Sequence, residues 1–174
     1  MRIGRFTEWK GVGMGAERIC RLLEAARWIS VVIGFVLAFG YGTEPAERLH
    51  LLAPWLVGSL AGLTGIESVF LGEAAARLAG YAPGGAYQRQ SGMNNLALAA
   101  TALLSYGLGW GAAADVALVS VLLVFLSLSA ANHLWSAWRE GNLARRSFTR
   151  PAATAGLVAV SLPLLVATAG ALGR

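Results

Sequence analysis

The chain has 174 residues, a hydrophobic content of 56% and a formal net charge of +5. Soluble domains are roughly 45–50% apolar, so this composition argues against a soluble globular protein. A single cysteine excludes an intrachain disulfide and a multi-cysteine metal site. No nucleic-acid-binding motif accompanies the positive charge, and we therefore expect no nucleic-acid partner.

Five apolar stretches predict an all-α fold, an integral membrane helical bundle with five transmembrane helices. In chain order the stretches are residues 29–41, 51–71, 94–110, 113–129 and 152–172. The second and the fifth contain 21 residues each, and a helix needs about 20 apolar residues to cross a hydrocarbon core. The first stretch is short, which leaves an alternative of four spans preceded by an N-terminal helix that lies in the membrane interface.

The same pattern predicts how the chain is divided. Residues 1–28 hold six of the fourteen Lys and Arg residues, and we predict that they form a basic cytoplasmic leader. Within this leader, residues 16–28 place apolar and charged side chains on opposite faces of a helix, as an amphipathic helix does. Residues 29–174 would then form the five-span transmembrane domain.

The other basic residues predict the orientation in the membrane. The connection after the second stretch holds two and the connection after the fourth holds four, which leaves only Arg48 and Arg174 elsewhere. Cytoplasmic loops carry such an excess of Lys and Arg. We therefore expect a multi-pass protein of the cell (cytoplasmic) inner membrane, with its N-terminus in the cytoplasm and its C-terminus exterior.

Aromatic residues agree with this topology, because they recur at the expected depth of each membrane interface. Those expected on the cytoplasmic side are Trp28, Tyr87, Trp135 and Trp138, and those on the exterior side are Tyr41, Trp55, Tyr106 and Trp110.

Local signals predict three further features. A surface helix should follow the second stretch and continue to Ala79, where Gly80 ends it. Pro151 should be the first residue of the last helix. Small residues also form a stripe through which another helix can approach closely, and we favour packing within the chain over a dimer interface. The stripe consists of Gly58, Gly62 and Gly65.

Polar residues near the cytoplasmic ends of the second, third and fourth stretches should meet at one depth. This candidate cluster contains Glu67, Gln88, Gln90, Asn94, Asn95, Asn132, His133 and Asn142. A carboxyl group at such a depth must be paired, hydrogen-bonded or protonated. We therefore expect Glu67 to have either a raised pKa or a close partner, for which His133, Arg77 and the amides are the candidates. The cluster is either structural, a cytoplasm-facing site for a small molecule or a proton, or a docking surface for a partner subunit.

The segment around these residues resembles a known family. It contains Glu73, the pair Gly80-Tyr81 and the run YQRQSGMNNLA at residues 87–97. These features resemble a family of small prokaryotic multi-span proteins known only as a domain of unknown function, whose pattern is roughly FQxExGxxNLA at the head of a span. Later elements of that family are matched by Asn132-His133-Leu134, Gly141-Asn142 and Pro163.

The resemblance covers about residues 55–170, and the leader and first span occur in only some members. It implies a multi-span architecture and no established activity. The chain departs from the family pattern at two positions. Gln90 stands where the family usually has an acidic residue, and Glu67 stands where some members have His.

The sequence favours a binding or accessory role for the polar cluster over catalysis. We predict no catalytic residue, no metal and no cofactor, because the only histidines, His50 and His133, should lie at opposite interfaces. The expected partners are membrane lipids and a partner membrane subunit or a second copy of the chain. Two alternatives stay open. The first is a proton-coupled small-solute transporter that titrates Glu67, and the second is a membrane enzyme that uses His133 as a base on a lipid or quinone headgroup.

Overall fold

The structure is a computed structural model that describes residues 10–82 and 85–173, with side chains from residue 14 onward. Six helices and no strand make up the described residues, which confirms the all-α prediction. The helices are α1 (Lys10–Tyr41), α2 (Pro45–Phe70), α3 (Gly72–Ala79), α4 (Gly85–Leu108), α5 (Ala112–Arg139) and α6 (Arg146–Leu172).

Four of these helices, α1, α2, α5 and α6, are long and apolar enough to cross a membrane. Helix α3 is too short, with 8 residues. Helix α4, which holds the predicted third span, falls short because its first three turns carry glutamine, arginine and asparagine side chains. The short first stretch is not the weak one, since α1 continues without a break from Lys10 to Tyr41. The predicted boundary between leader and membrane domain at residue 28 therefore lies inside one helix, and residues 1–9 of the leader lie outside the described residues.

Helix α2 is the centre of the bundle and contacts all five other helices. Its leucines and valine form the middle of the hydrophobic core, with Leu49, Leu52, Leu56 and Val57 fully buried. Burial of side chains of this size contributes about 1.5–3 kcal/mol each in water. In a membrane the same contacts act mainly through close packing.

The glycine stripe of α2 lies against α4, which confirms packing within the chain. A Cβ atom added to Gly62 would lie 3.3 Å from the Cβ atom of Ala99, and one added to Gly65 would lie 2.8 Å from the carbonyl oxygen of Gly92. Only glycine lets the two backbones come this close.

The predicted surface helix corresponds to α3, which ends where the sequence indicated. Gly80 is the C-cap residue of α3 and adopts the left-handed conformation with φ +74°, as glycine commonly does at the end of a helix. The prediction for Pro151 was wrong. Helix α6 begins five residues earlier, at Arg146, and Pro151 lies inside it.

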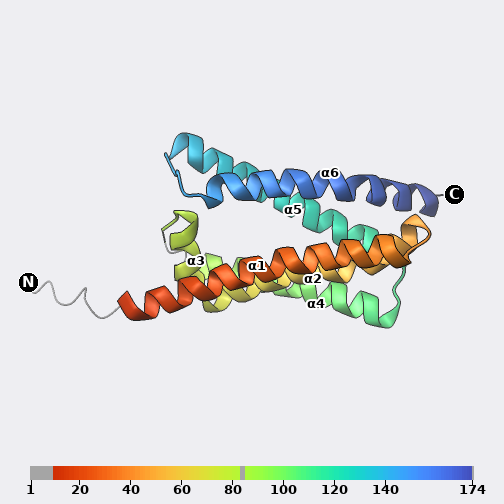
Figure 1. Cartoon of the computed structure of the whole chain (residues 1–174), viewed down its shortest axis with the longest axis horizontal. Helices are drawn as coiled ribbons and strands as arrows, with labels where there is room; N and C mark the ends of the chain where they lie inside the picture. The colour runs from red at the N-terminus through yellow and green to blue at the C-terminus, as the bar shows by residue number, and fades with distance from the viewer. Residues whose placement is uncertain (1–9, 83–84, 174) are drawn as a thin grey trace, which may run out of the picture.

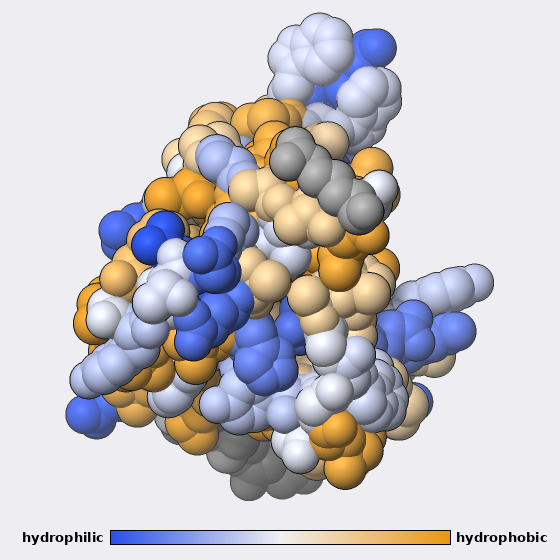
Figure 2. Space-filling view, turned by 90° about the vertical axis from the view of Figure 1, so that its right-hand side faces the viewer, coloured by the Kyte–Doolittle hydropathy of each residue, from blue (hydrophilic) through white to orange (hydrophobic). Residues whose placement is uncertain are grey.

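The two ends of the bundle differ in charge. We call the end that contains the beginning of α1, α3, the beginning of α4 and the connection between α5 and α6 the basic end (Figure 1). The opposite end contains the connections between α1 and α2 and between α4 and α5, together with the C-terminus. Viewed onto this opposite end, hydrophilic residues gather near the middle and also project at several points of the rim, with hydrophobic residues between them (Figure 2).

Candidate functional site at the basic end

Glu67 lies at the centre of a buried ion-pair network that joins three helices. Its side chain, in the last turn of α2, is 2% exposed. Arg27 of α1 donates a hydrogen bond through Nη2 to Oε2 of Glu67, and Arg146 of α6 donates through Nη1 to Oε1 at 3.2 Å. The other terminal nitrogen of Arg146 donates to Glu24 Oε2 at 2.6 Å. We call Glu24, Arg27, Glu67 and Arg146 the Glu67 network.

The network balances its own charge, with two carboxylates against two guanidinium groups. Glu24 and Arg27 lie three residues apart on α1 and therefore share a face. Arg146 is the first residue of α6, and its forked guanidinium group binds two carboxylates at once. Pairing of this kind is what a buried carboxylate requires, because an unpaired charge in a dry interior is costly.

The partners predicted for Glu67 were wrong. Arg77 lies instead beside Glu17, at 3.7 Å, and Glu73, at 3.9 Å. His133 lies beside a different arginine, Arg150.

His133 is buried between Tyr81 and Arg150. The hydroxyl group of Tyr81 lies 2.9 Å from Nδ1, and its ring stacks on the imidazole with centroids 5.5 Å apart. Arg150 Nη1 lies 3.5 Å from Nε2. A guanidinium group can only donate, so Nε2 is the acceptor and Nδ1 carries the hydrogen that faces Tyr81. Both ring nitrogens are therefore occupied by protein groups.

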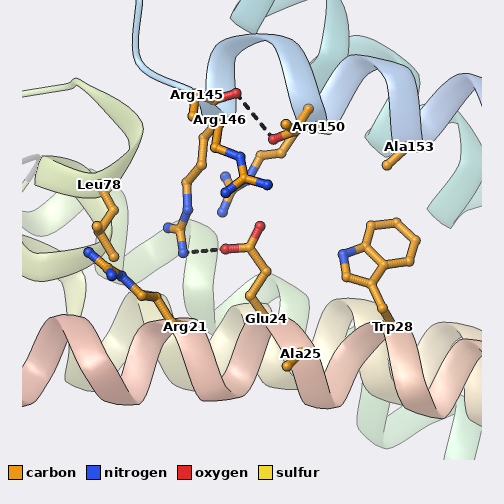
Figure 3. A pocket seen from close by; sticks show the side chains of 10 residues that line it. Arg21, Glu24, Ala25, Trp28, Leu78, Arg145, Arg146, Arg150 and Ala153 are labelled. Carbon is orange, nitrogen blue, oxygen red and sulfur yellow. Dashed lines mark hydrogen bonds and ion pairs between the residues drawn. The ribbon is translucent and has the colours of Figure 1, made fainter.

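A cavity of about 610 Å³ lies between α1 and α6, directly beside the Glu67 network. Its lining residues are Arg21, Glu24, Ala25, Trp28, Leu78, Arg145, Arg146, Thr149, Arg150 and Ala153. Arg21, Glu24 and Trp28 extend from α1 on one side, and Arg146 and Arg150 extend from α6 on the other (Figure 3). The wall thus combines four arginines with one glutamate.

Three of the four arginines are not neutralised. Glu24 and Glu67 both bind Arg146. Within the part of the chain that the structure describes, Arg21, Arg145 and Arg150 have no carboxylate within 4 Å. The cavity is therefore bordered by an excess of positive charge.

A second and smaller cavity, of about 240 Å³, lies on the other side of Arg150. Helices α2, α3, α4 and α6 contribute to its wall, which includes Glu67, Tyr81, Gln88 and Arg150. Arg150 borders both cavities, and it also contacts His133. It is therefore the residue that connects the predicted polar cluster with the larger cavity.

The structure brings some members of the predicted cluster together and separates others. Glu67 and Gln88 line the smaller cavity, and Gln88 also donates to the carbonyl oxygen of Gly72 at 2.7 Å. His133 contacts Tyr81 and Arg150, two other residues of that lining. Asn142 lies in the connection between α5 and α6, where it donates to the carbonyl oxygen of Ala79 at 2.9 Å. Asn95 is buried within α4. The remaining three members are exposed on the surface, and they are Gln90, Asn94 and Asn132.

The sequence reasoning missed the arginines that define the site. Arg27 was counted only among the six basic residues of the leader, and Arg146 and Arg150 only among the four basic residues of the connection after the fourth stretch. One signal was present: an acidic residue inside a span requires a cation, and Arg27 and Arg150 each lie only two positions before an apolar stretch.

A second polar pair at the opposite end was also missed. Asp115, which is 1% exposed, lies 2.8 Å from Nδ1 of His50. The imidazole stacks on the ring of Tyr106 with centroids 4.9 Å apart. This group connects α2, α4 and α5. His50 and His133 lie at opposite ends, as the sequence indicated.

Comparison with known proteins gives a family and no activity. No curated protein and no solved structure matches the chain. A family of unknown function, DUF6790, matches residues 24–173. The match includes residues 24–41 of α1, so the first span belongs to the family domain. The matched region is therefore longer than the resemblance at residues 55–170 indicated. The chain is a member of the DUF6790 family of unknown function.

Proposed function

We propose that the chain is a multi-pass membrane protein with five transmembrane helices, in which α4 is the fifth. The support is its register against α2. Residues 58, 62 and 65 of α2 face residues 103, 99 and 96 of α4, in antiparallel order. Because the two helices lie side by side along their length, a bilayer crossed by α2 also surrounds α4. The polar beginning of α4 then lies at one interface.

The surface of the bundle supports a membrane location. Large apolar side chains face outward along the helices, for example Val32, Val124 and Val166, each 60–62% exposed. Contiguous apolar surface of this kind is rare in soluble monomers. Exposed aromatic residues lie near both ends, as they do in interfacial belts. They include Trp135, Trp138 and Tyr87 at the basic end, and Tyr41, Tyr106 and Trp110 at the opposite end.

We place the basic end in the cytoplasm, in the inner membrane, with residues 1–28 as its leader, because lysine and arginine accumulate on that side. Single cysteines at Thr43 and Leu143, in a Cys20→Ser background, would test this. A membrane-impermeant maleimide added to intact cells should label the first position and spare the second. Equal labelling of both would contradict the orientation.

The function that the site supports best is binding of a phosphate-bearing anion at the cytoplasmic side. One observation carries this proposal, namely three arginines that have no carboxylate partner among the described residues, around a cavity of about 610 Å³. Guanidinium groups bind phosphate oxygens through paired hydrogen bonds. The Glu67 network holds Arg146 and the N-terminus of α6 in place, so the neighbouring Arg145 and Arg150 are positioned without being neutralised.

The same contacts weigh against the two alternatives. A carrier that titrates Glu67 would have to separate it from Arg27 and Arg146 in each cycle, at a cost that buried pairs make large. An enzyme that uses His133 as a base would need a ring nitrogen that faces a substrate, but Tyr81 and Arg150 occupy both.

Glycerol 3-phosphate is a suitable soluble probe for the proposed site. A ligand that binds the folded protein stabilises it by an amount that grows with the logarithm of the ligand concentration above its Kd, so the probe should raise the melting temperature of the purified protein in detergent. The variant R21Q/R145Q changes two exposed side chains and should lose most of this shift. Arg89, exposed at the beginning of α4, provides the matched control R89Q. An equal shift in both variants, or no shift in the wild type, would overturn the proposal.

A further inference from the structure

We propose that the ligand of this site is an anionic glycerophospholipid of the cytoplasmic leaflet, which enters sideways between α1 and α6. This inference rests on the proposed function, because its phosphate would occupy the arginine-lined cavity. It adds that the acyl chains lie in the gap between the two helices.

The wall of the cavity has a charged part and an apolar part, as a phospholipid has a charged headgroup and apolar acyl chains. Arginines border the side near the basic end, whereas Ala25, Trp28 and Ala153 border the side that leads into the bundle. The indole ring of Trp28 reaches toward α6 at the level of Ala153 (Figure 3). A free phosphate ion gains nothing from contact with an apolar wall, whereas an acyl chain is stabilised by such contact.

The backbones of α1 and α6 lie apart from each other. Among the described residues, no Cα atom of α1 lies within 8 Å of one of α6, whereas α2 contacts both helices and closes the gap from behind. Figure 1 shows the two helices separating further toward the basic end. No backbone contact between α1 and α6 therefore has to break for a molecule to enter from the surrounding bilayer.

Apolar residues continue the two walls beyond the cavity. On α1, Val32 and Val36 follow Trp28 at helical spacing and are 62% and 64% exposed. On α6, Gly156 and Val160 follow Ala153 in the same way and are also exposed. From Trp28 to Val36 the wall extends about 12 Å along the helix axis, which suits the upper part of an acyl chain.

Size and charge both favour an anionic lipid. Cavities of roughly 300–1,000 Å³ hold ligands much larger than a phosphate ion, and this one has about 610 Å³. Three arginines without carboxylate partners would repel the quaternary ammonium group of a zwitterionic choline lipid. They would attract the negative headgroups that are abundant in the cytoplasmic leaflet.

Brominated lipids test the inference, because bromine quenches the fluorescence of a nearby indole. The protein would be placed in phosphatidylcholine nanodiscs that contain phosphatidylglycerol, with one lipid at a time brominated near the headgroup. The Trp28 signal would be taken as the difference between the wild type and W28F. We expect brominated phosphatidylglycerol to quench this signal several-fold more strongly, at equal mole fraction, than brominated phosphatidylcholine.

Variants separate the headgroup from the acyl chain. R21Q/R145Q should abolish the preference for phosphatidylglycerol, and R89Q should keep it. A153F narrows the gap at the level of Trp28, so it should reduce quenching by phosphatidylglycerol while glycerol 3-phosphate still raises the melting temperature. V124F, on the membrane face of α5, is its control.

Three results would contradict the inference, each in a distinguishable way. Equal quenching by both lipids, with the melting shift by glycerol 3-phosphate intact, would identify a soluble phosphate compound as the ligand and leave the proposed function standing. Equal quenching together with no shift would remove both proposals. If A153F has the melting temperature of the wild type, and brominated phosphatidylglycerol quenches its Trp28 signal as in the wild type, lateral entry alone is refuted.

Discussion

The Glu67 network makes a quantitative prediction about stability. In Glu67→Ala, Arg27 keeps only its hydrogen bond to the carbonyl oxygen of Leu63, while Arg146 keeps Glu24. Both arginine side chains are at most 7% exposed, so neither regains water. Removal of one partner from a buried pair costs about 3–5 kcal/mol. We expect about 3 kcal/mol, because one of the two arginines stays paired and the unfolded helices find other partners in a membrane.

The matched control is Glu73→Ala, which removes a carboxylate from the same end of the bundle. The Glu73 side chain is 71% exposed and lies 3.9 Å from Arg77, so its loss should change stability by less than about 0.5 kcal/mol. Unfolding in mixed micelles would measure both variants. A double-mutant cycle of Glu67→Ala with Arg27→Gln should give a coupling energy of about 1–3 kcal/mol. Equal stability losses in Glu67→Ala and Glu73→Ala, or a coupling near zero, would refute the network as described.

Three further predictions concern other contacts. Gly65→Ala should destabilise the bundle by about 1–3 kcal/mol, because the added methyl group meets α4, whereas Gly156→Ala, with no atom within 4 Å, should be neutral or stabilising in the same unfolding assay. Asp115→Ala should cost about 1–3 kcal/mol and speed hydrogen exchange in the first turns of α5, and unchanged exchange there would contradict the pairing with His50. Asn142→Ala should cost about 1–2 kcal/mol and increase proteolysis of the connection between α5 and α6, and cleavage at the wild-type rate would show that its hydrogen bonds do not hold this connection.

The fold was largely predictable because its signals are local. Apolar stretches ended at Tyr41 and Leu172, and α1 and α6 end at the same residues. The end of α3 at Gly80 could be predicted because glycine adopts a positive φ without steric strain, wherever it lies in the fold. Basic residues marked one end of the bundle because each connection could be judged separately. The beginning of α6 was misplaced because the basic residues before Pro151 were assigned to a loop, although arginine is a good helix former.

The site was less predictable because it depends on distances between helices. Arg27 and Arg146 are separated from Glu67 by 40 and 79 positions, and no spacing rule connects residues so far apart. Amides on exposed faces could not be distinguished from buried ones, since α4 has polar side chains around most of its first turns. Asn94 and Asn95 show this, because the first is exposed and the second is buried.

One consequence follows from the way α1 and α6 are connected. The two helices do not touch through their backbones, and Arg146 bridges them through Glu24 and Glu67. The separation of α1 and α6 is thus set by the packing of both helices against α2 and, at the basic end, by the side chain of Arg146 that reaches Glu24. Substitutions at Arg146 should therefore alter which molecules bind between α1 and α6 while the remaining helices keep their packing. Related proteins can then differ in ligand selectivity and share one fold.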